Sequence, residues 1–407
     1  MGKILLLRGR IVSASMDIED GLIAVDGGHI AYAGLASELP WEPGDAGELS
    51  AAEKGAGRIL LPGLVDLHCH GAHGSDFSEG SVDGARAAAR YLHSRGTTTL
   101  LASLVTGAPA DLVRNLRILR SIAEEGLVAG SHLEGPFLSA GQCGAHDPAL
   151  LLEPDAGLMG ELLEAAGPTL ASVTLAAELP GADGLVDLLA TRGVIPSLGH
   201  TAADHQGAAS FLERAATGLS GASTQAVSRG GQRPTVTHLF NAMPSLHHRS
   251  PGPVSACLSA ASAGIAVVEL IADGVHLAPE TVKTVFELVG AGNIALVTDS
   301  MAATGLKDGH YKLGTLAVTV DGGTARMDST GAIAGGTATL LDVVRSAVAA
   351  GVSLRDAITS ATAVPASVLG LSRRAGDLRA GMLADVVVVD PELNLTGVLR
   401  GGEWVAG

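Results

Sequence analysis

Aromatic residues are scarce in this chain. Phe, Tyr and Trp make up only 2% of its 407 residues, whereas 47% of the residues are hydrophobic. A large core can therefore form, but it has to be built from Ala, Val, Leu and Ile side chains. The length is too great for one small core and suffices for a barrel plus a second unit.

Cysteine is almost absent, and the three residues Cys69, Cys143 and Cys257 form no Cys-x-x-Cys pair. This excludes a disulfide framework of the kind found in small secreted domains. The first ten residues lack the apolar segment and cleavage site of a signal peptide. No charge-free apolar run reaches the length of a membrane span. We therefore expect a soluble cytoplasmic protein.

Basic residues are outnumbered, with 26 Lys and Arg against 42 Asp and Glu, for a formal net charge of -16. Such a balance argues against nucleic acid or an anionic membrane as the main partner. An anionic small-molecule substrate stays compatible with it, because a few local cations can dominate the charge of a pocket.

The two ends of the chain resemble each other and differ from the middle. The N-terminal part contains short apolar runs and a hairpin signal at Asp26-Gly27-Gly28-His29. A strand-like run at Ala384–Asp390 lies near the C-terminal end. We expect both ends, residues 1–58 and 372–407, to form one small β-sandwich domain.

The middle, residues 59–371, alternates between strand-like apolar runs and helical patterns. This alternation predicts an α/β protein with a TIM-type (β/α)8 barrel as its catalytic domain. The expected strands are Leu64–Leu67, Thr97–Ser103, Leu127–Leu133, Ser172–Ala176, Val194–Leu198, Val236–Phe240, Ala266–Ala272 and Ile294–Thr298.

The first of these strands ends in two histidines, His68 and His70. Residues i and i+2 of a strand point to the same side, so the two imidazoles can share one divalent metal ion. Taken alone the signal is modest, because many His-x-His pairs arise by chance.

Potential metal ligands also follow several later strands. Each has a structural alternative, such as a helix cap for Asp299. In a TIM barrel, however, functional residues gather at the C-terminal ends of the strands. The joint pattern therefore favours a functional site over coincidence. Its members after the first strand are Glu134, His200, His238, the pair Asp273 and His276, and Asp299.

Six motifs together carry a resemblance to a known family. They are Pro62–Gly71, His132–Phe137, Leu198–Thr201, Thr237–Met243, Asp273–His276 and Thr298–Asp299. The pattern resembles the amidohydrolase superfamily and, within it, the N-acetylglucosamine-6-phosphate deacetylases. The resemblance extends over nearly the whole chain, and the Glu-Gly-Pro and His-Leu-Phe-Asn-Ala-Met segments are its most specific parts.

The resemblance implies a metal site. The ligands of the principal metal would be Glu134, His200 and His238. A second site would be completed by His68, His70 and Asp299, with Glu134 bridging. Zinc is the expected ion, one or two per subunit, and the ligand set is also compatible with iron or manganese.

The same resemblance implies the catalytic groups. A bound metal lowers the pKa of its water, to about 7 in favourable zinc sites. Asp299 would take the proton of this water as general base and pass it to the departing amine. His146 matches the family histidine that polarises the acetyl carbonyl, although from the residues alone it would be an exposed loop histidine.

Substrate binding requires a phosphate site, and the chain has no Gly-x-x-x-x-Gly-Lys loop. Arg249 offers a planar fork for phosphate oxygens, with a solvated basic loop as the alternative. The resemblance assigns phosphate binding to His276 and to Arg249 of a neighbouring subunit, which implies a homodimer. The other implied substrate contacts are Ala145, Asn241, Ala242, Asp273, Ala334 and Gly335.

We thus expect a hydrolase of amino-sugar metabolism that converts N-acetyl-D-glucosamine 6-phosphate to D-glucosamine 6-phosphate and acetate. Three alternatives stay open at this point. The substrate can be the galactosamine epimer, which differs at one hydroxyl. The chain can hydrolyse a cyclic amide, although those enzymes often bridge their metals with a carboxylated lysine. It can also be a metal-free barrel that only binds sugar phosphate.

Two features have no firm role. Ser220–Pro234 is rich in Ser, Gly and Gln and is expected to be a surface insertion. Cys143 precedes His146 in the same loop, where a redox-sensitive thiol and an inert one are both compatible with the sequence. Cys69 and Cys257 are expected to be packing residues.

Overall fold

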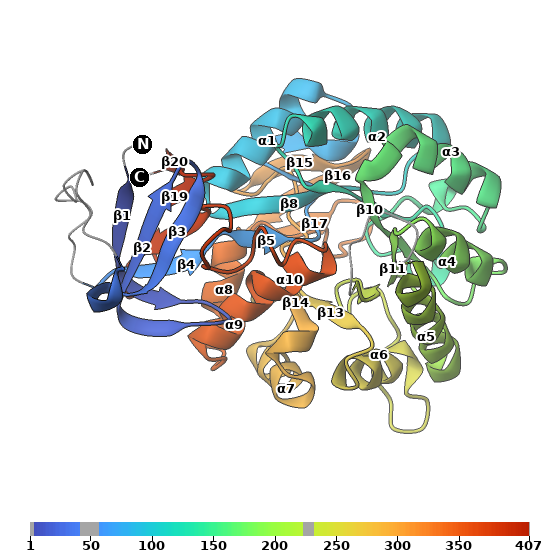
Figure 1. Ribbon diagram of the computed structural model, residues 1–407. Helices are drawn as coiled ribbons and strands as arrows, with labels where there is room; N and C mark the ends of the chain where they lie inside the picture. The colour runs from blue at the N-terminus through green and yellow to red at the C-terminus, as the bar shows by residue number, and fades with distance from the viewer. Residues whose placement is uncertain (1–3, 41–56, 223–231, 407) are drawn as a thin grey trace.

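The computed structural model describes residues 4–40, 57–222 and 232–406. An eight-stranded parallel sheet and a separate seven-stranded sheet organise them. The seven-stranded sheet contains both chain ends and lies at one side of the barrel (Figure 1). Most of the predicted insertion at 220–234 lies outside the described residues.

The seven-stranded sheet joins strands from the two ends of the chain. Its order is β20-β19-β18-β4-β1-β2-β3, so the strands of the predicted sandwich form one continuous sheet. Side chains from both halves, including Leu7, Ile23, Val386 and Leu399, share one apolar core. The strands are β1 (Leu5–Val12), β2 (Asp17–Asp26), β3 (His29–Leu35), β4 (Ile59–Pro62), β18 (Val386–Val389), β19 (Leu395–Arg400) and β20 (Glu403–Ala406).

The passage from this sheet to the barrel runs through Gly63. Its N–H donates to the Asp385 carbonyl at 2.9 Å, and an added Cβ would lie 2.1 Å from Thr98 Oγ1. A side chain therefore does not fit there. The terminal sheet includes residues 59–62 and so extends past the predicted boundary at residue 58. The division into two domains stays a prediction.

The parallel sheet forms the predicted TIM-type barrel. Its strands are β5 (Leu64–Asp66), β8 (Thr97–Leu104), β9 (Gly130–Glu134), β10 (Leu170–Leu175), β11 (Ile195–Leu198), β12 (Thr235–Val236), β13 (Val267–Leu270) and β14 (Ile294–Leu296). β12 departs most from its predicted run, since only Val236 of Val236–Phe240 lies in the strand, and β13 and β14 are also shorter than predicted. His238, Phe240 and Ala242 have φ angles of 29°, 78° and 49°, which take the chain out of the extended conformation.

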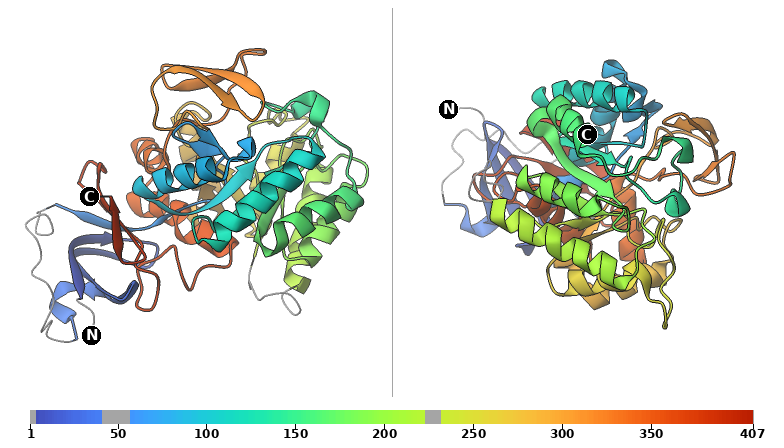
Figure 2. Two further views of the ribbon diagram at one scale, coloured as in Figure 1. Left: turned by 90° about the horizontal axis from the view of Figure 1, so that it is seen from above. Right: turned by 90° about the vertical axis from the view of Figure 1, so that its right-hand side faces the viewer.

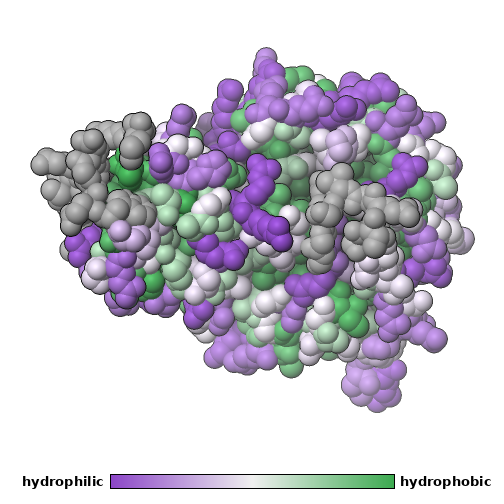
Figure 3. All heavy atoms as spheres, in the orientation of Figure 1, coloured by the Kyte–Doolittle hydropathy of each residue, from purple (hydrophilic) through white to green (hydrophobic). Residues whose placement is uncertain are grey.

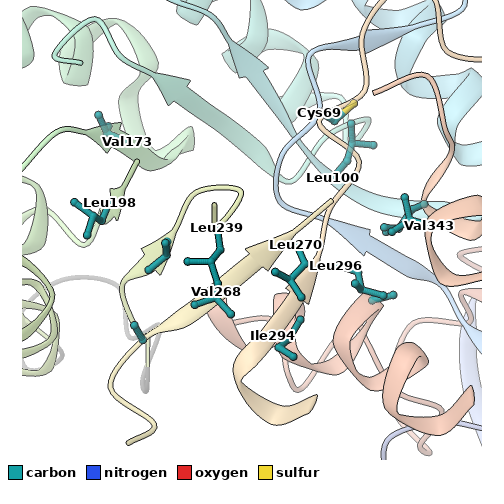
Figure 4. Packing of buried hydrophobic residues seen from close by; sticks show 14 of the residues in the cluster. Cys69, Leu100, Val173, Leu198, Leu239, Val268, Leu270, Ile294, Leu296 and Val343 are labelled. Carbon is teal, nitrogen blue, oxygen red and sulfur yellow. The ribbon is translucent and has the colours of Figure 1, made fainter. Parts of the chain in front are cut away.

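Helices cover the outside of the barrel (Figure 1). Strand residues such as Val268 and Leu270 share an apolar cluster with Val343 of a covering helix (Figure 4). No helix in the described ranges is long and apolar enough to cross a membrane. The helices are α1 (Val82–Ser94), α2 (Pro109–Glu124), α3 (Ala156–Ala166), α4 (Ala182–Thr191), α5 (His205–Ala222), α6 (Gly252–Ser262), α7 (Pro279–Val289), α8 (Leu340–Ala349), α9 (Leu354–Ala361) and α10 (Ala363–Val368).

A three-stranded antiparallel ribbon between β14 and α8 was not predicted. It consists of β15 (Gly309–Leu313), β16 (Leu316–Asp321) and β17 (Thr324–Met327). Figure 2 shows it in orange at the edge of the barrel. Its apolar side packs against Val105, Met301 and Ala334 in a separate small cluster. A two-stranded hairpin, β6 (Gly71–Ala72) with β7 (Ser75–Asp76), follows β5.

The barrel closes just beyond the ends of its first and last strands. β5 and β14 occupy the two ends of the sheet order. The Asp299 N–H donates to the His68 carbonyl at 2.9 Å, and the His70 N–H donates to the Ser300 carbonyl at 2.7 Å. Closure therefore takes place among the residues predicted to bind metal.

The buried His93 of α1 predicts a pH dependence of stability. Burial, and then the charge of Arg400, lower its pKa from 6.5 to about 3. Below pH 6.5 the unfolded chain takes up a proton at this residue and the folded chain does not, so stability falls as the pH falls. At about pH 4, burial of this neutral histidine should lower the free energy of unfolding by about 3 kcal/mol relative to neutral pH.

Urea unfolding of His93→Gln between about pH 4 and pH 7 tests this expectation. The variant should lose less stability on acidification than the wild type. Exchange of the exposed His29 for Gln should leave the change in unfolding free energy with pH as in the wild type. If the unfolding free energy of His93→Gln and of the wild type fell equally with pH, His93 would not be the source of the pH dependence.

Candidate active site

The C-terminal ends of the barrel strands bring the predicted ligands together. Two groups have ligand atoms that all lie within 4.8 Å of one another. One group is His68, His70 and Asp299, and the other is Glu134, His146 and His200. His238 lies beside the second group, since its Nε2 is 3.0 Å from Glu134 Oε1.

The Glu134 group has the spacing of a metal site. Glu134 Oε1 lies 3.0 Å from Nε2 of His200 and 3.0 Å from Nε2 of His238, and these two nitrogens are 3.1 Å apart. Ligands of a tetrahedral zinc ion are about 3.3 Å apart. His200 Nδ1 donates to the Gln142 carbonyl at 2.8 Å. A neutral ring then carries its lone pair on Nε2, where a metal needs it.

The His68 group has a similar spacing. Nε2 of His68 and Nε2 of His70 are 3.0 Å apart, and Asp299 Oδ1 lies 3.4 Å and 3.2 Å from them. His68 Nδ1 donates to Glu269 Oε2 at 3.3 Å, so its Nε2 also carries a lone pair. Glu134 Oε2 is 3.2 Å from His70 Nε2. Glu134 therefore lies between the two groups.

These contacts fit a bound divalent cation. Lone pairs of buried imidazoles that face each other at about 3 Å repel unless a proton or a cation lies between them. Imidazole nitrogen and carboxylate oxygen are ligands that suit zinc and are shared by iron and manganese. The residues at both groups are therefore suited to hold such an ion.

His146 offers the opposite chemistry from its neighbours. Its Nδ1 accepts from the Thr106 N–H at 3.3 Å, which leaves the ring proton on Nε2, 3.2 Å from Glu134 Oε2. Burial lowers the pKa of His146 to about 4, so the ring is neutral at pH 7. His146 is therefore placed to donate a hydrogen bond rather than to ligate a metal.

Asp299 has the charge state that a proton acceptor needs. Burial alone would raise its pKa, but the charge that His68 carries when it is protonated and the hydrogen bond from His70 hold the pKa below its usual range. The carboxylate is therefore ionised at neutral pH.

The backbone at three of these residues is unusual. His200, His238 and Asp299 have φ angles of 48°, 29° and 48°, a region that non-glycine residues rarely adopt. Such conformations persist only where the surroundings impose them, and they cluster at functional sites.

Most of the predicted substrate contacts surround the ligands. Asn241 donates to the His238 carbonyl at 3.1 Å. An added Cβ on Gly335 would lie 2.9 Å from the Asp299 carbonyl oxygen. Ala145 and Ala334 share one apolar cluster with the ribbon. An added Cβ on Gly144 would meet His200 and Ala242 at 3.2 Å and 3.7 Å.

Asp273 and His276 form a nearly buried pair near the ligands. Asp273 Oδ2 lies 2.8 Å from His276 Nδ1, and each side chain is 6% exposed. Burial lowers the pKa of His276, but the hydrogen bond and charge of Asp273 raise it above its usual value. The charge of Asp299 acts in the same direction. The raised pKa favours the protonated, cationic form of His276 beside the candidate metal site.

Arg249 is different, because it lies on an exposed loop between β12 and α6. Its guanidinium makes no hydrogen bond or ion pair with the described residues of its own chain. The loop is the yellow-green segment that projects from the body in Figure 1, and hydrophilic atoms gather at the same place in Figure 3. Within one subunit the structure does not join Arg249 to the ligand groups.

The sequence analysis gave no role to Glu269, which contacts His68. The available signal was a lone acid within the apolar run Ala266–Ala272. Cys69 is fully buried with its thiol 3.1 Å from Ser300 Oγ, as a packing residue should be, and burial raises its pKa. Cys257 is equally buried, and Cys143 is a free, half-buried thiol.

Comparison with known proteins identifies the family. The sequence model of the Amidohydrolase family matches residues 59–405. The chain belongs to the amidohydrolase family. It is 35% identical to N-acetylglucosamine-6-phosphate deacetylase of Homo sapiens over 360 residues, which are 86% of this chain and 84% of that protein. For the Bacillus subtilis (strain 168) protein of the same name, identity is 34% over 401 residues, or 96% and 94% of the two chains.

A solved structure agrees over the full length. It is N-acetyl-D-glucosamine-6-phosphate deacetylase of Mycobacterium smegmatis, as a mutant in complex with N-acetyl-D-glucosamine-6-phosphate. The two folds superpose with a TM-score of 0.89 at 36% sequence identity and cover 100% of both chains. This amidohydrolase chain thus has a full-length structural counterpart.

The position of Glu134 between the groups predicts its effect on metal content. Glu134→Gln should lower the bound metal per subunit more than either His68→Asn or His200→Asn, because each histidine belongs to one group only. Elemental analysis after dialysis against a weak chelator measures this. Full metal content in Glu134→Gln would show that Glu134 does not ligate.

Proposed function

We propose that this amidohydrolase removes the acetyl group of N-acetyl-D-glucosamine 6-phosphate, giving D-glucosamine 6-phosphate and acetate. The observation that carries the proposal is the convergence of Glu134, His200 and His238 with an ionised Asp299 and a hydrogen-bond donor, His146. The names of its relatives support the substrate. A cyclic amide is not favoured, because a glutamate rather than a lysine lies between the ligand groups.

The residues have distinct roles in the proposed reaction. A divalent metal, zinc by preference, would be held by Glu134, His200 and His238, with a second position at His68, His70 and Asp299. When bound, it supplies a water of lowered pKa and a Lewis acid for the carbonyl. Asp299 takes the proton of the attacking water and delivers it to the leaving amine. His146 donates from Nε2 to the carbonyl oxygen as negative charge develops there.

Phosphate recognition is proposed to involve two subunits. His276, whose protonated form is favoured by Asp273, would bind the phosphate from within the subunit. Arg249 would reach the site of a neighbouring subunit, which makes the protein a homodimer. Its exposed position, and the lack of partners for its guanidinium among the described residues of its own chain, support this arrangement. Ala145, Asn241, Ala242, Ala334 and Gly335 would contact the sugar.

We also propose that the two structural units act as domains. The barrel, residues 59–371, would carry the catalytic site. The terminal unit, residues 1–58 and 372–407, would be a structural support, with β4 as the strand that links them.

Asp299→Asn tests the proposed mechanism. Loss of the general base should reduce acetate release from N-acetylglucosamine 6-phosphate by about 10²–10⁴-fold. Acetate and bound metal are measured on the same metal-loaded sample, with the exposed Asp83→Asn as a matched control. Near-normal turnover of Asp299→Asn would refute the assigned role.

Arg249→Ala tests the phosphate contact. Loss of charge-assisted hydrogen bonds worth about 1.5–3 kcal/mol should raise KM for the phosphorylated sugar by about 10–100-fold. The rate on unphosphorylated N-acetylglucosamine should not change. Arg249→Lys keeps the charge but loses the planar pair of donors, so its KM should lie between those of the wild type and Arg249→Ala.

Mixing the two impaired variants, at a concentration of phosphorylated sugar where each alone is slow, tests the shared site. Heterodimers of Asp299→Asn with Arg249→Ala contain one site that has both intact residues, so activity on the phosphorylated sugar should return. If Arg249→Ala lowered activity on both sugars equally, or if mixing restored nothing, the two-subunit phosphate site would be wrong.

A further inference from the structure

Glu269 lies inside the barrel, directly behind a candidate metal ligand. Its strand neighbours Val268 and Leu270 pack outward in the layer between barrel and helices (Figure 4). Val267 and Ile271 instead belong to the cluster inside the barrel. Because side chains alternate along a strand, Glu269 points inward with these two. Its carboxylate is buried, with 5% of the side chain exposed.

One oxygen of Glu269 contacts both ligand groups, but in different ways. Oε2 lies 3.3 Å from His68 Nδ1 and 3.3 Å from the backbone nitrogen of His238. The contact with His68 fixes the orientation and tautomer of its ring. The contact with His238 fixes only its backbone. Glu269 can therefore orient an imidazole of the His68 group but not one of the Glu134 group.

The other imidazoles show the same asymmetry. His200 Nδ1 donates to a neutral carbonyl, that of Gln142. Nδ1 of His70 and Nδ1 of His238 have no hydrogen-bond partner among the described residues. Each proposed metal position thus has one ligating histidine with an anchored Nδ1, and only that of His68 is anchored by a carboxylate. A carboxylate behind a ligating imidazole raises its basicity and its affinity for metal.

The charge of Glu269 also needs an explanation. No Lys or Arg is among the buried residues of the described chain. A buried carboxylate is costly unless a cation or several donors compensate it. Its donors are an imidazole N–H and a backbone N–H. A cation on the opposite nitrogen of His68 would polarise the Nδ1–H bond and offset this charge.

We propose that Glu269 is a positioning residue that controls occupancy of the second metal position, formed by His68, His70 and Asp299. The first position, at Glu134, His200 and His238, does not depend on its carboxylate. The inference rests on the proposed metal-dependent function. On this proposal, the carboxylate of Glu269 decides whether the site holds one metal ion or two.

Metal titration of the full-length protein tests the proposal. The wild type, Glu269→Gln and Glu269→Leu are stripped with a chelator and titrated with Zn²⁺ against a chromophoric competitor. The wild type should bind two ions. Glu269→Leu should keep the tighter ion and bind the second about 10–100-fold more weakly. Glu269→Gln keeps an acceptor oxygen without the charge, so its affinity for the second ion should lie between those of the wild type and Glu269→Leu.

Two controls separate positioning from a general structural role. Glu287→Gln changes an exposed carboxylate of α7 that contacts none of the proposed ligands, and it should bind both ions normally. Thermal unfolding of the metal-free proteins reports the fold. A purely structural Glu269 would lower the melting temperature and weaken both ions together.

The outcomes that overturn the proposal are distinct. It is wrong if both variants bind the second ion with wild-type affinity, if both ions weaken in parallel, or if the wild type binds one ion only. Acetate release is measured on the same samples. A wild type that binds two ions but releases no acetate contradicts the proposed function and leaves the role of Glu269 standing.

Discussion

Closure of the barrel is the constraint on which the site depends. His68 and His70 follow the first barrel strand and Asp299 follows the last, so they meet only when these strands lie together. Asp66 secures the join from below, because its carboxylate accepts from the Thr298 hydroxyl at 2.7 Å and from the His68 N–H at 3.2 Å. A defect in this seam would therefore displace ligands of one group and spare the other.

The barrel could be predicted from the sequence because buried parallel strands consist of apolar runs, and helical patterns separate these runs. Potential ligands at the strand ends and the family resemblance then indicated the candidate site. The ribbon of β15 to β17 was missed, because short strands of half-exposed residues such as Tyr311 are hard to distinguish from loop. Glu269 was visible as an acid in an apolar run, but its partner His68 is remote in sequence and only the fold brings them together.

The proposed roles of the histidines depend on backbone groups that no motif encodes. His200 faces a carbonyl, that of Gln142, and so presents a lone pair to the centre of the site. His146 faces an amide, that of Thr106, and so presents a proton. Both rings approach the same carboxylate, Glu134, at 3.0 Å and 3.2 Å. Proximity alone would make both residues ligands, whereas their hydrogen-bond partners separate binding from donation.

The terminal sheet has a consequence for synthesis of the chain. Strands β1 to β4 leave the ribosome early and can pair with one another, but β4 receives its second neighbour, β18, only after the whole barrel has been made. Until then one edge of the sheet has unpaired backbone groups, which readily pair with other chains. Nascent chains that stall before Val386 would carry this open edge, so the last strands protect the growing protein from self-association as well as completing its fold.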